Sequence, residues 1–288
     1  MHNEVFFNKK INNDITLAVI SDIHYYPKFN TNIFKKLIKQ IKNRQPNYIC
    51  VVGDILDESK FTEIENLITF FKDLAEISPV IVVLGNHDEK TGAMFKWQSK
   101  SNSVLTNALK KINNLHLLED NIWQDKNITF YGFNLSFNYY EKYNETYESF
   151  VTEAKKLKCP LPKETYNITL FHSPANIYQF IAKNPSHPLN NTDLILSGHM
   201  HNGCLPFIIA HPLNKIFKIN VGLISPQKTF LPKLAQGKVT KEVKNGYIYE
   251  GVTKLSHSTK MFHTFDFIFQ KKVEFLTIKP AKKYKNHH

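Results

Sequence analysis

The stretch that decides the fold is residues 16–24, TLAVISDIH, in which a short apolar run ends abruptly at Ser21 and Asp22. Runs of this kind are typical of strands that are buried on both faces of a sheet. Two further apolar runs within the first 90 residues also end at polar residues. They are 48–52 (YICVV), followed by Gly53-Asp54, and 80–84 (VIVVL), followed by Gly85-Asn86.

Amphipathic helical patterns separate these three runs. Apolar residues recur on one face of 33–41, and again from Phe61 to Leu74, where Ser59 is the expected N-cap. The order β-α-β-α-β predicts an α/β fold whose sheet is covered by helices on both faces.

The rest of the chain predicts shorter elements, and we expect one domain over residues 1–288. Helices are expected at 101–112, 145–158 and around 177–181, and strands at 115–118, 128–135, 166–171, 193–197, 205–210, 216–221, 247–250, 262–269 and 272–278. The lysine-rich segment 226–246 is polar, and we predict that it forms a basic loop or flap.

Charge is the unusual bulk property, with a net charge of +12 at pH 7 and a sequence pI near 9.3. Such an excess favours anionic partners, namely nucleic acid, acidic lipid headgroups or a phosphorylated substrate, although a solvated lysine-rich surface explains it as well. Arg44 is the one arginine among the 37 basic side chains. Bidentate guanidinium contacts to phosphate are therefore nearly unavailable, so compensating cations must be lysines or metal ions.

Cysteine content and hydropathy predict a cytoplasmic protein. The three cysteines, Cys50, Cys159 and Cys204, have no CxxC spacing, which argues against a disulfide scaffold or a thiolate zinc site and fits a reducing compartment. Residues 1–15 contain no apolar signal-peptide core, and no stretch approaches 18 uninterrupted apolar residues. These observations leave peripheral attachment to a membrane surface open.

Polar groups follow five of the predicted strands, and we expect them to meet at one edge of the sheet, because α/β sheets bind ligands at the carboxyl ends of their strands. The groups are Asp22-Ile23-His24, Gly53-Asp54, Gly85-Asn86-His87-Asp88, His172 and Gly198-His199-Met200-His201. Carboxylate, imidazole and amide ligands suit Mn, Fe, Zn or Ni rather than a thiolate-preferring ion. Helix capping would explain Asp22 or Asp54 singly, but not five groups together.

In this order the groups resemble the signature of the calcineurin-like metallophosphoesterase superfamily, D-x-H, G-D, G-N-H-[DE], H and G-H-x-H, across residues 22–201. The resemblance implies a four-layer α/β/β/α sandwich with a dinuclear centre of two divalent metal ions, drawn from Mn, Fe, Zn, Ni or Mg. By the family pattern the ligands are Asp22, His24, Asp54 and His201 for the first ion, and Asp54, Asn86, His172 and His199 for the second. It further implies that His87 donates a proton to the leaving oxygen or stabilises charge on phosphorus, and that Asp88 orients the imidazole of His87.

The activity implied by the resemblance is hydrolysis of a phosphate ester or anhydride by metal-activated water. Residues 53–57 (GDILD), 171–174 (FHSP) and 196–203 (LSGHMHNG) look like the small bacterial phosphodiesterase branch, which is related to UDP-diacylglucosamine hydrolases. No arginine follows the second or third motif, unlike in phosphoprotein phosphatases. We therefore expect a phosphodiesterase or pyrophosphatase acting on a phosphorylated small-molecule or lipid substrate. Relatives typically continue the last motif with Gly-Gly-Gln, whereas this chain has Asn202-Gly203-Cys204.

Two alternatives from other classes share these residues. A metal-dependent nuclease would use the same ions and would explain the positive charge, but the sequence contains no recognisable DNA-binding module. A non-catalytic metal-binding scaffold is disfavoured because none of the expected ligands is missing. The lysines of 226–246 alternate with Phe230, Leu231, Leu234 and Val239, a composition that suits an anionic membrane surface and a solvated loop alike.

Four tyrosines are candidates for the border of a substrate pocket. They are Tyr25 and Tyr26, beside the first motif, and Tyr139 and Tyr140. Core packing explains them equally well, and the sequence does not indicate an oligomeric state.

Overall fold

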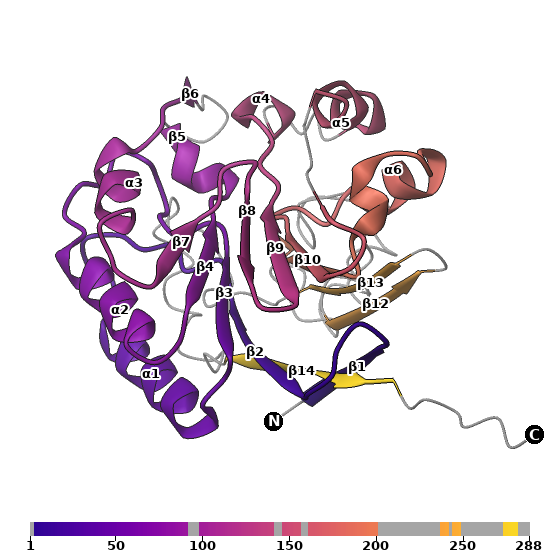
Figure 1. Cartoon of the computed structure of the whole chain (residues 1–288). Coiled ribbons are helices and arrows are strands. Elements are labelled where there is room, and N and C mark those ends of the chain that lie inside the picture. Colours follow the sequence, from indigo (N-terminus) through magenta and orange to yellow (C-terminus); the bar gives the residue numbers. More distant parts are fainter. Residues whose placement is uncertain are drawn as a thin grey trace, which may run out of the picture.

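Two six-stranded sheets form the centre of the molecule, with helices on the outer side of each (Figure 1). The structure is a computed structural model. It describes residues 3–91, 98–140, 146–156, 161–200, 237–241, 244–248 and 273–281.

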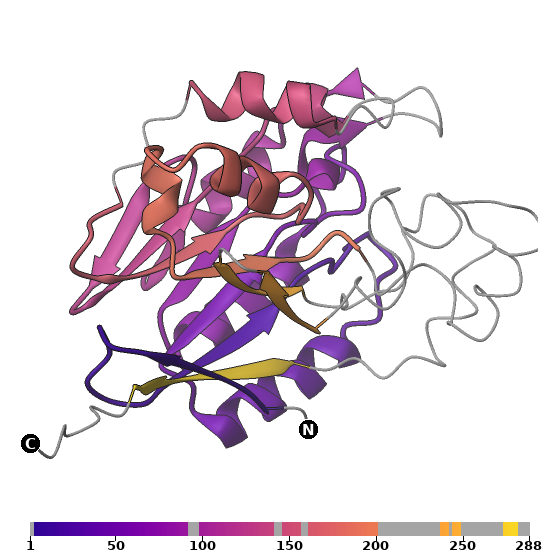
Figure 2. The same ribbon diagram turned by 90° about the vertical axis from the view of Figure 1, so that its right-hand side faces the viewer.

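The first sheet has the strand order β1-β14-β2-β3-β4-β7. Its strands are β1 (Asn3–Asn8), β14 (Glu274–Pro280), β2 (Ile15–Ile20), β3 (Tyr48–Val52), β4 (Val80–Val83) and β7 (Leu115–Leu117). The strands from β2 to β7 are parallel, so their carboxyl ends lie at one edge of the sheet. Strand β14 runs antiparallel to β2 and parallel to β1, which brings segments from the two ends of the chain side by side (Figure 2).

The second sheet has the order β12-β13-β11-β10-β9-β8. Its strands are β12 (Gly237–Lys241), β13 (Lys244–Ile248), β11 (Leu194–Ser197), β10 (Tyr166–Leu170), β9 (Ile128–Gly132) and β8 (Ile122–Asp125). The four central strands are parallel, and the two outermost strands are antiparallel to their neighbours. A separate two-stranded ribbon pairs β5 (Lys90–Thr91) with β6 (Gln98–Ser99).

The helices divide between the two sheets (Figure 1). Those beside the first sheet are α1 (Asn32–Arg44), α2 (Glu65–Ala75) and α3 (Ser103–Leu109), and those beside the second are α4 (Phe137–Tyr140), α5 (Tyr147–Ala154) and α6 (Ile177–Lys183). Two short 3₁₀ turns, η1 (Asn86–Glu89) and η3 (Pro188–Asn191), complete the described elements.

Alternating side chains of the second sheet point into two different cores. Phe130 and Leu196 pack in the cluster that also contains Val51 of the first sheet, whereas Tyr131 and Ile195 pack in a second cluster with residues of α5 and α6. This two-residue alternation is the side-chain period of a strand. One core therefore lies between the sheets, and the other lies between the second sheet and its helices.

The arrangement confirms the α/β class and the four-layer sandwich, and it corrects one expectation. The first sheet is not covered by helices on both faces, because one face packs against the second sheet. The pattern of the first 90 residues does not distinguish the two coverings, since either one buries the strands on both sides.

The helix predicted from Phe61 begins later, at Glu65, and Ser59 is not its N-cap. The reason is a tertiary contact: the side-chain amide of Asn102 donates hydrogen bonds to the carbonyls of Ser59 (2.6 Å) and Phe61 (2.8 Å). These bonds hold the segment before α2 in a non-helical conformation. Strands β1 and β8 were not predicted, and the strand expected over 128–135 ends at Gly132.

The described part of the basic segment 226–246 consists of strands. Residues 237–241 and 244–246 belong to the antiparallel pair β12 and β13, so the loop prediction is wrong for this part, while 226–236 and 242–243 lie outside the described residues. The strands expected at 205–210, 216–221 and 262–269 also lie outside them. Among the residues that the structure describes, no helix has the length and apolar character needed to cross a membrane.

Candidate functional site

Turns that follow strands of both sheets meet at one place. Asp22 and His24 follow β2, and Asp54 follows β3. The backbone N–H of Asp22 donates to the carbonyl of Gly53, and that of His24 donates to the carbonyl of Asp54, both at 3.0 Å. The two turns therefore run side by side and present their polar side chains together.

The other polar groups arrive from three further strands. Asn86 begins η1 directly after β4, His172 follows β10, and His199 follows β11. The turns after β10 and β11 are joined by a hydrogen bond from the N–H of Gly198 to the carbonyl of His172 (3.0 Å). His201 lies outside the described residues.

Four of these residues adopt left-handed backbone conformations that are costly for side chains other than glycine. Their φ angles are 53° for Asp22, 47° for His24, 49° for Asp54 and 68° for His199. Each such conformation costs on the order of 1–3 kcal/mol, and residues held this way tend to cluster at functional sites. The turns are therefore shaped to direct these side chains at some expense of stability.

The carboxylate of Asp54 lies at the centre of the cluster and is 1% exposed. Its Oδ2 is 3.2 Å from Nε2 of His172, 3.6 Å from Nε2 of His24 and 4.0 Å from Nε2 of His87. Its Oδ1 accepts the backbone N–H of His87 at 2.8 Å.

The same charges shift the pKa values of these groups. Burial alone would raise the pKa of Asp54, but the surrounding imidazoles, His172 first, hold it well below its usual range. Burial would lower the pKa of His172, yet attraction to Asp54 outweighs burial and raises it to about 10. The pocket therefore favours positive charge around one buried carboxylate.

Close backbone approach explains two of the glycines. A Cβ atom on Gly85 would collide with the backbone nitrogen and Oδ1 of Asp54. A Cβ atom on Gly198 would lie 2.5 Å from Oδ2 of Asp22 and would collide with Oγ of Ser21. Both oxygens of Asp22 also lie 3.1 Å from the backbone nitrogen of His199, which donates to them. Larger residues would push the carboxylates out of the cluster.

Three overlapping sets of side chains have ligand atoms close enough to hold a cation. Within each set, one nitrogen or carboxylate oxygen from every residue lies within 4.8 Å of the others. The first set is Asp22, His24 and Asp54, the second is Asp54, His172 and His199, and the third is His24, Asp57 and His87. Asp54 belongs to the first two.

Further features of these residues fit divalent cations. Oδ1 of Asn86 is buried and accepts no hydrogen bond within the part of the chain that the structure describes. An unpaired buried oxygen is costly, and a cation would satisfy it. Nδ1 of His172 lies 2.8 Å from the carbonyl of Val52 and donates its proton to it, so Nε2, which faces Asp54, is the nitrogen that would bind a cation after losing its own proton.

The position of Asp88 corrects one expectation from the resemblance. Its carboxylate does not orient the imidazole of His87 but accepts backbone N–H groups of Ile55 (3.2 Å), Leu56 (2.7 Å) and Gly85 (2.8 Å). Burial, and then the charge of Asp54, raises the pKa of Asp88 to about 7, although the three N–H donors favour its charged form. Asp88 therefore ties the turn after β3 to the turn after β4.

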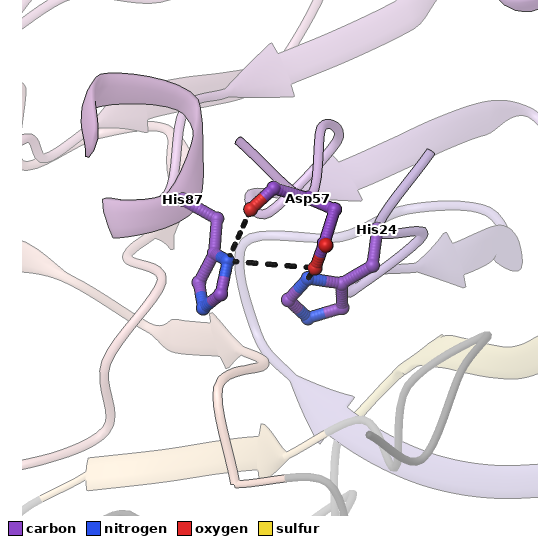
Figure 3. A group of neighbouring side chains, drawn as sticks. All are labelled: His24, Asp57 and His87. Carbon is purple, nitrogen blue, oxygen red and sulfur yellow. Dashed lines mark hydrogen bonds and ion pairs between the residues drawn. The ribbon is translucent and has the colours of Figure 1, made fainter. Parts of the chain in front are cut away.

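Asp57 takes the position beside His87 that was expected for Asp88 (Figure 3). The backbone carbonyl of Asp57 lies 2.7 Å from Nδ1 of His87, and its carboxylate Oδ1 lies 3.3 Å from Nδ1 of His24. Asp57 is 2% exposed. We did not predict this role, and the signal that would have indicated it is a second acid three residues after Asp54.

The sequence resembles those of known proteins. The family model for calcineurin-like phosphoesterases matches residues 15–203. An uncharacterized metallophosphoesterase of Campylobacter jejuni, Cj0846, is 24% identical over 205 residues, which cover 71% of this chain and 49% of that protein. The chain thus spans about half the length of this relative. A solved structure of GAP50, described as the anchor in the inner membrane complex of Plasmodium, is 12% identical with a TM-score of 0.39, over 84% of this chain and 72% of that one.

The substitution Asp88→Asn should destabilise the fold by about 1–3 kcal/mol, because an amide has one acceptor oxygen where the carboxylate serves three N–H groups. Urea unfolding measures the loss. Asp14→Asn is the control, since Asp14 is exposed and lies 3.7 Å from Lys279, and it should change the unfolding free energy by less than about 0.5 kcal/mol. Equal stability of the two variants would contradict the bracing role of Asp88.

Proposed function

Because this chain belongs to the calcineurin-like phosphoesterase family, we propose that it is a metal-dependent phosphoester hydrolase with a dinuclear centre. The observation that carries the proposal is the buried carboxylate of Asp54, which is shared by two sets of potential ligands. A carboxylate has two oxygens and a full negative charge, so it can bridge two cations.

The ligand sets define which residues would hold each ion. Asp22, His24 and Asp54 would hold the first, with His201 as the further ligand expected from the family pattern. Asp54, His172 and His199 would hold the second, together with Oδ1 of Asn86. When bound, two divalent cations supply Lewis acidity, lower the pKa of a bound water and neutralise phosphate charge.

Backbone carbonyls set the protonation of two imidazoles. A carbonyl oxygen only accepts, so Nδ1 of His87 must carry a proton toward Asp57, as Nδ1 of His172 does toward Val52. Nε2 of His172 would bind a cation after losing the proton that it holds toward Asp54. The remaining nitrogen of His87, Nε2, lies 4.0 Å from Asp54, and in the charged imidazole it is the atom that would give a proton to the leaving oxygen.

The sequence supports a more specific proposal for the reaction and the class of substrate. The segments that look like the small bacterial phosphodiesterase branch, and the lack of arginine after the second and third motifs, support a phosphodiesterase or pyrophosphatase. The net charge of +12 supports a substrate that is phosphorylated, and either nucleotide-linked or lipid-linked at an anionic membrane surface.

Removal of the His87 side chain tests the proposed chemistry. His87→Ala should lower kcat for bis(p-nitrophenyl) phosphate by about 10²–10⁴-fold while bound metal is retained, because His87 is not a proposed ligand. Asn86→Ala should lose activity together with part of the metal. His116→Ala is the control, because it removes an imidazole that is not part of the cluster and instead stacks on Trp123 of β8 at a centroid distance of 4.2 Å. Its kcat should not change. An unchanged rate in His87→Ala would contradict the assignment.

Asp57 should support metal binding through His24, because its carboxylate lies beside Nδ1 of that imidazole. Asp57→Ala should weaken binding of Mn²⁺ by about 10–100-fold in a calorimetric titration, as is usual for groups that orient metal ligands. Asp57→Asn keeps an acceptor oxygen and should lose less. Glu58→Ala is the control, a neighbouring buried acid that pairs with Lys60. Affinity of Asp57→Ala equal to that of the natural protein would refute this role.

The proposed membrane association rests on the lysines of 226–246 and is tested with liposomes. One of these lysines, Lys238, is exposed, and its Nζ lies 4.8 Å from the centre of the Phe6 ring. Changing Lys228, Lys233, Lys238, Lys241 and Lys244 to Gln should reduce co-sedimentation with phosphatidylserine vesicles at least tenfold, since each lysine near an anionic surface contributes about 1 kcal/mol.

The matched control for the liposome experiment removes the same charge elsewhere. It changes five exposed lysines of α1 and α2 to Gln, namely Lys35, Lys36, Lys39, Lys42 and Lys72. These variants should bind vesicles as the natural protein does. Equal loss in both sets would indicate only a general charge effect, and no binding by the natural protein would remove the membrane part of the proposal.

A further inference from the structure

The side chains of the cluster differ in exposure, and the difference indicates where a substrate approaches. Asp22 and His24 are fully buried, and Asp54 and His172 are each 1% exposed. In contrast, Asn86, His87 and His199 are 9%, 8% and 6% exposed. Solvent therefore reaches the cluster from the side of η1 and of the turn after β11.

Tyr140 lies on this more accessible side. Its ring centre is 5.7 Å from that of His199 and 6.5 Å from that of His172, and the residue is half-buried. It is thus an aromatic side chain beside two proposed ligands of one cation, with part of its surface accessible. Half-exposed aromatic rings of this kind present a flat face on which other planar groups stack.

The segment that carries Tyr140 is held firmly in place. Ser136 donates from its backbone N–H (2.9 Å) and its hydroxyl (2.6 Å) to the carboxylate of Glu153 in α5. Tyr139, which is fully buried, donates its N–H to the carbonyl of Ser136 and accepts a hydrogen bond from Asn176 at its hydroxyl, both at 3.0 Å. The backbone that precedes Tyr140 is therefore tied to α5 and to the segment before α6, and the Tyr140 side chain packs against the core outside the second sheet, so little conformational freedom is lost when a ligand stacks on its ring.

We propose that Tyr140 is a substrate-contacting residue, and that its ring stacks on a nucleobase attached to the scissile phosphate. The inference rests on the proposed phosphoesterase function and narrows its substrate class to nucleotide-linked esters or anhydrides. An acyl chain would also bury apolar surface against the Tyr140 ring, but a flexible chain does not benefit from a ring that is held in one orientation. A flat heterocycle gains from a fixed ring face whichever base it is, because every base has a π surface.

The test compares two diesters that share a leaving group. Thymidine 5′-(p-nitrophenyl phosphate) and methyl p-nitrophenyl phosphate both release p-nitrophenolate, so the ratio of their kcat/KM values reports the contribution of the nucleoside. Tyr140→Leu should reduce this ratio roughly tenfold, mainly through KM, whereas Tyr140→Phe should keep it. Tyr147→Leu is the matched control: Tyr147 also packs partly buried against the core outside the second sheet, but its ring lies under Lys183.

Bound metal and nucleotide binding are measured on the same variants. Tyr140→Leu should retain the metal content of the natural protein, and should bind thymidine 5′-monophosphate more weakly while binding methyl phosphate unchanged. An unchanged ratio of the two kcat/KM values in Tyr140→Leu, whether or not both values fall, would overturn the proposal. Loss of bound metal would overturn it as well, because it indicates that Tyr140 only supports the metal ligands. If the natural protein hydrolyses neither diester, the phosphodiesterase part of the proposed function fails, and the binding comparison alone decides the role of Tyr140.

Discussion

A single buried carboxylate, that of Asp54, constrains the rest of the site. It is almost without solvent contact, and an isolated charge in such a position costs several kcal/mol unless positive groups compensate it. Imidazoles from three different turns approach its Oδ2 within 4.0 Å, and the backbone N–H of His87 binds its Oδ1. Turns that follow strands of both sheets therefore lie close together around this one charge.

The backbone supplies the organisation that the side chains need. Carbonyl groups of Val52 and Asp57 accept the Nδ1 protons of His172 and His87, which leaves Nε2 of each ring directed toward Asp54. Left-handed conformations at four of the polar residues turn their side chains inward, and Gly85 leaves room for Asp54 itself. The strain of these turns is offset by the strands β2, β3 and β11 that precede them, which are buried along most of their length. The stability of the two packed sheets thus allows the turns at their edge to keep strained conformations.

Much of the site could be predicted because its residues end apolar runs. The runs before Asp22 and Asp54 have the composition of buried strands, and polar side chains directly after such strands must lie at the sheet edge. Pairing between β1 and β14 could not be predicted, since the two strands are separated by most of the chain and neither has a distinctive pattern. The packing of the second sheet against the first also joins segments that are distant in the sequence, so it could not be predicted either.

The roles of Asp88 and Asp57 could not be predicted from their distance to His87 along the sequence. Asp88 follows His87 directly, but both lie in a 3₁₀ turn, where successive side chains point roughly 120° apart, so one faces the cluster and the other faces the backbone of the previous turn. Asp57 looks like a surface acid in the sequence, because His24 and His87, which lie beside it, are distant along the chain. Its spacing of three residues from Asp54 is the one local signal, and the structure of the turns after β2, β3 and β4 shows what it contacts.

The central claim is that Asp54 is shared between two cations. Anomalous diffraction from crystals grown with Mn²⁺ tests it most directly, because the ions are located without reference to any assay. The account predicts two peaks about 3.5–4 Å apart, one on each side of the Asp54 carboxylate. A single peak that does not contact Asp54, or none near it, would contradict the account.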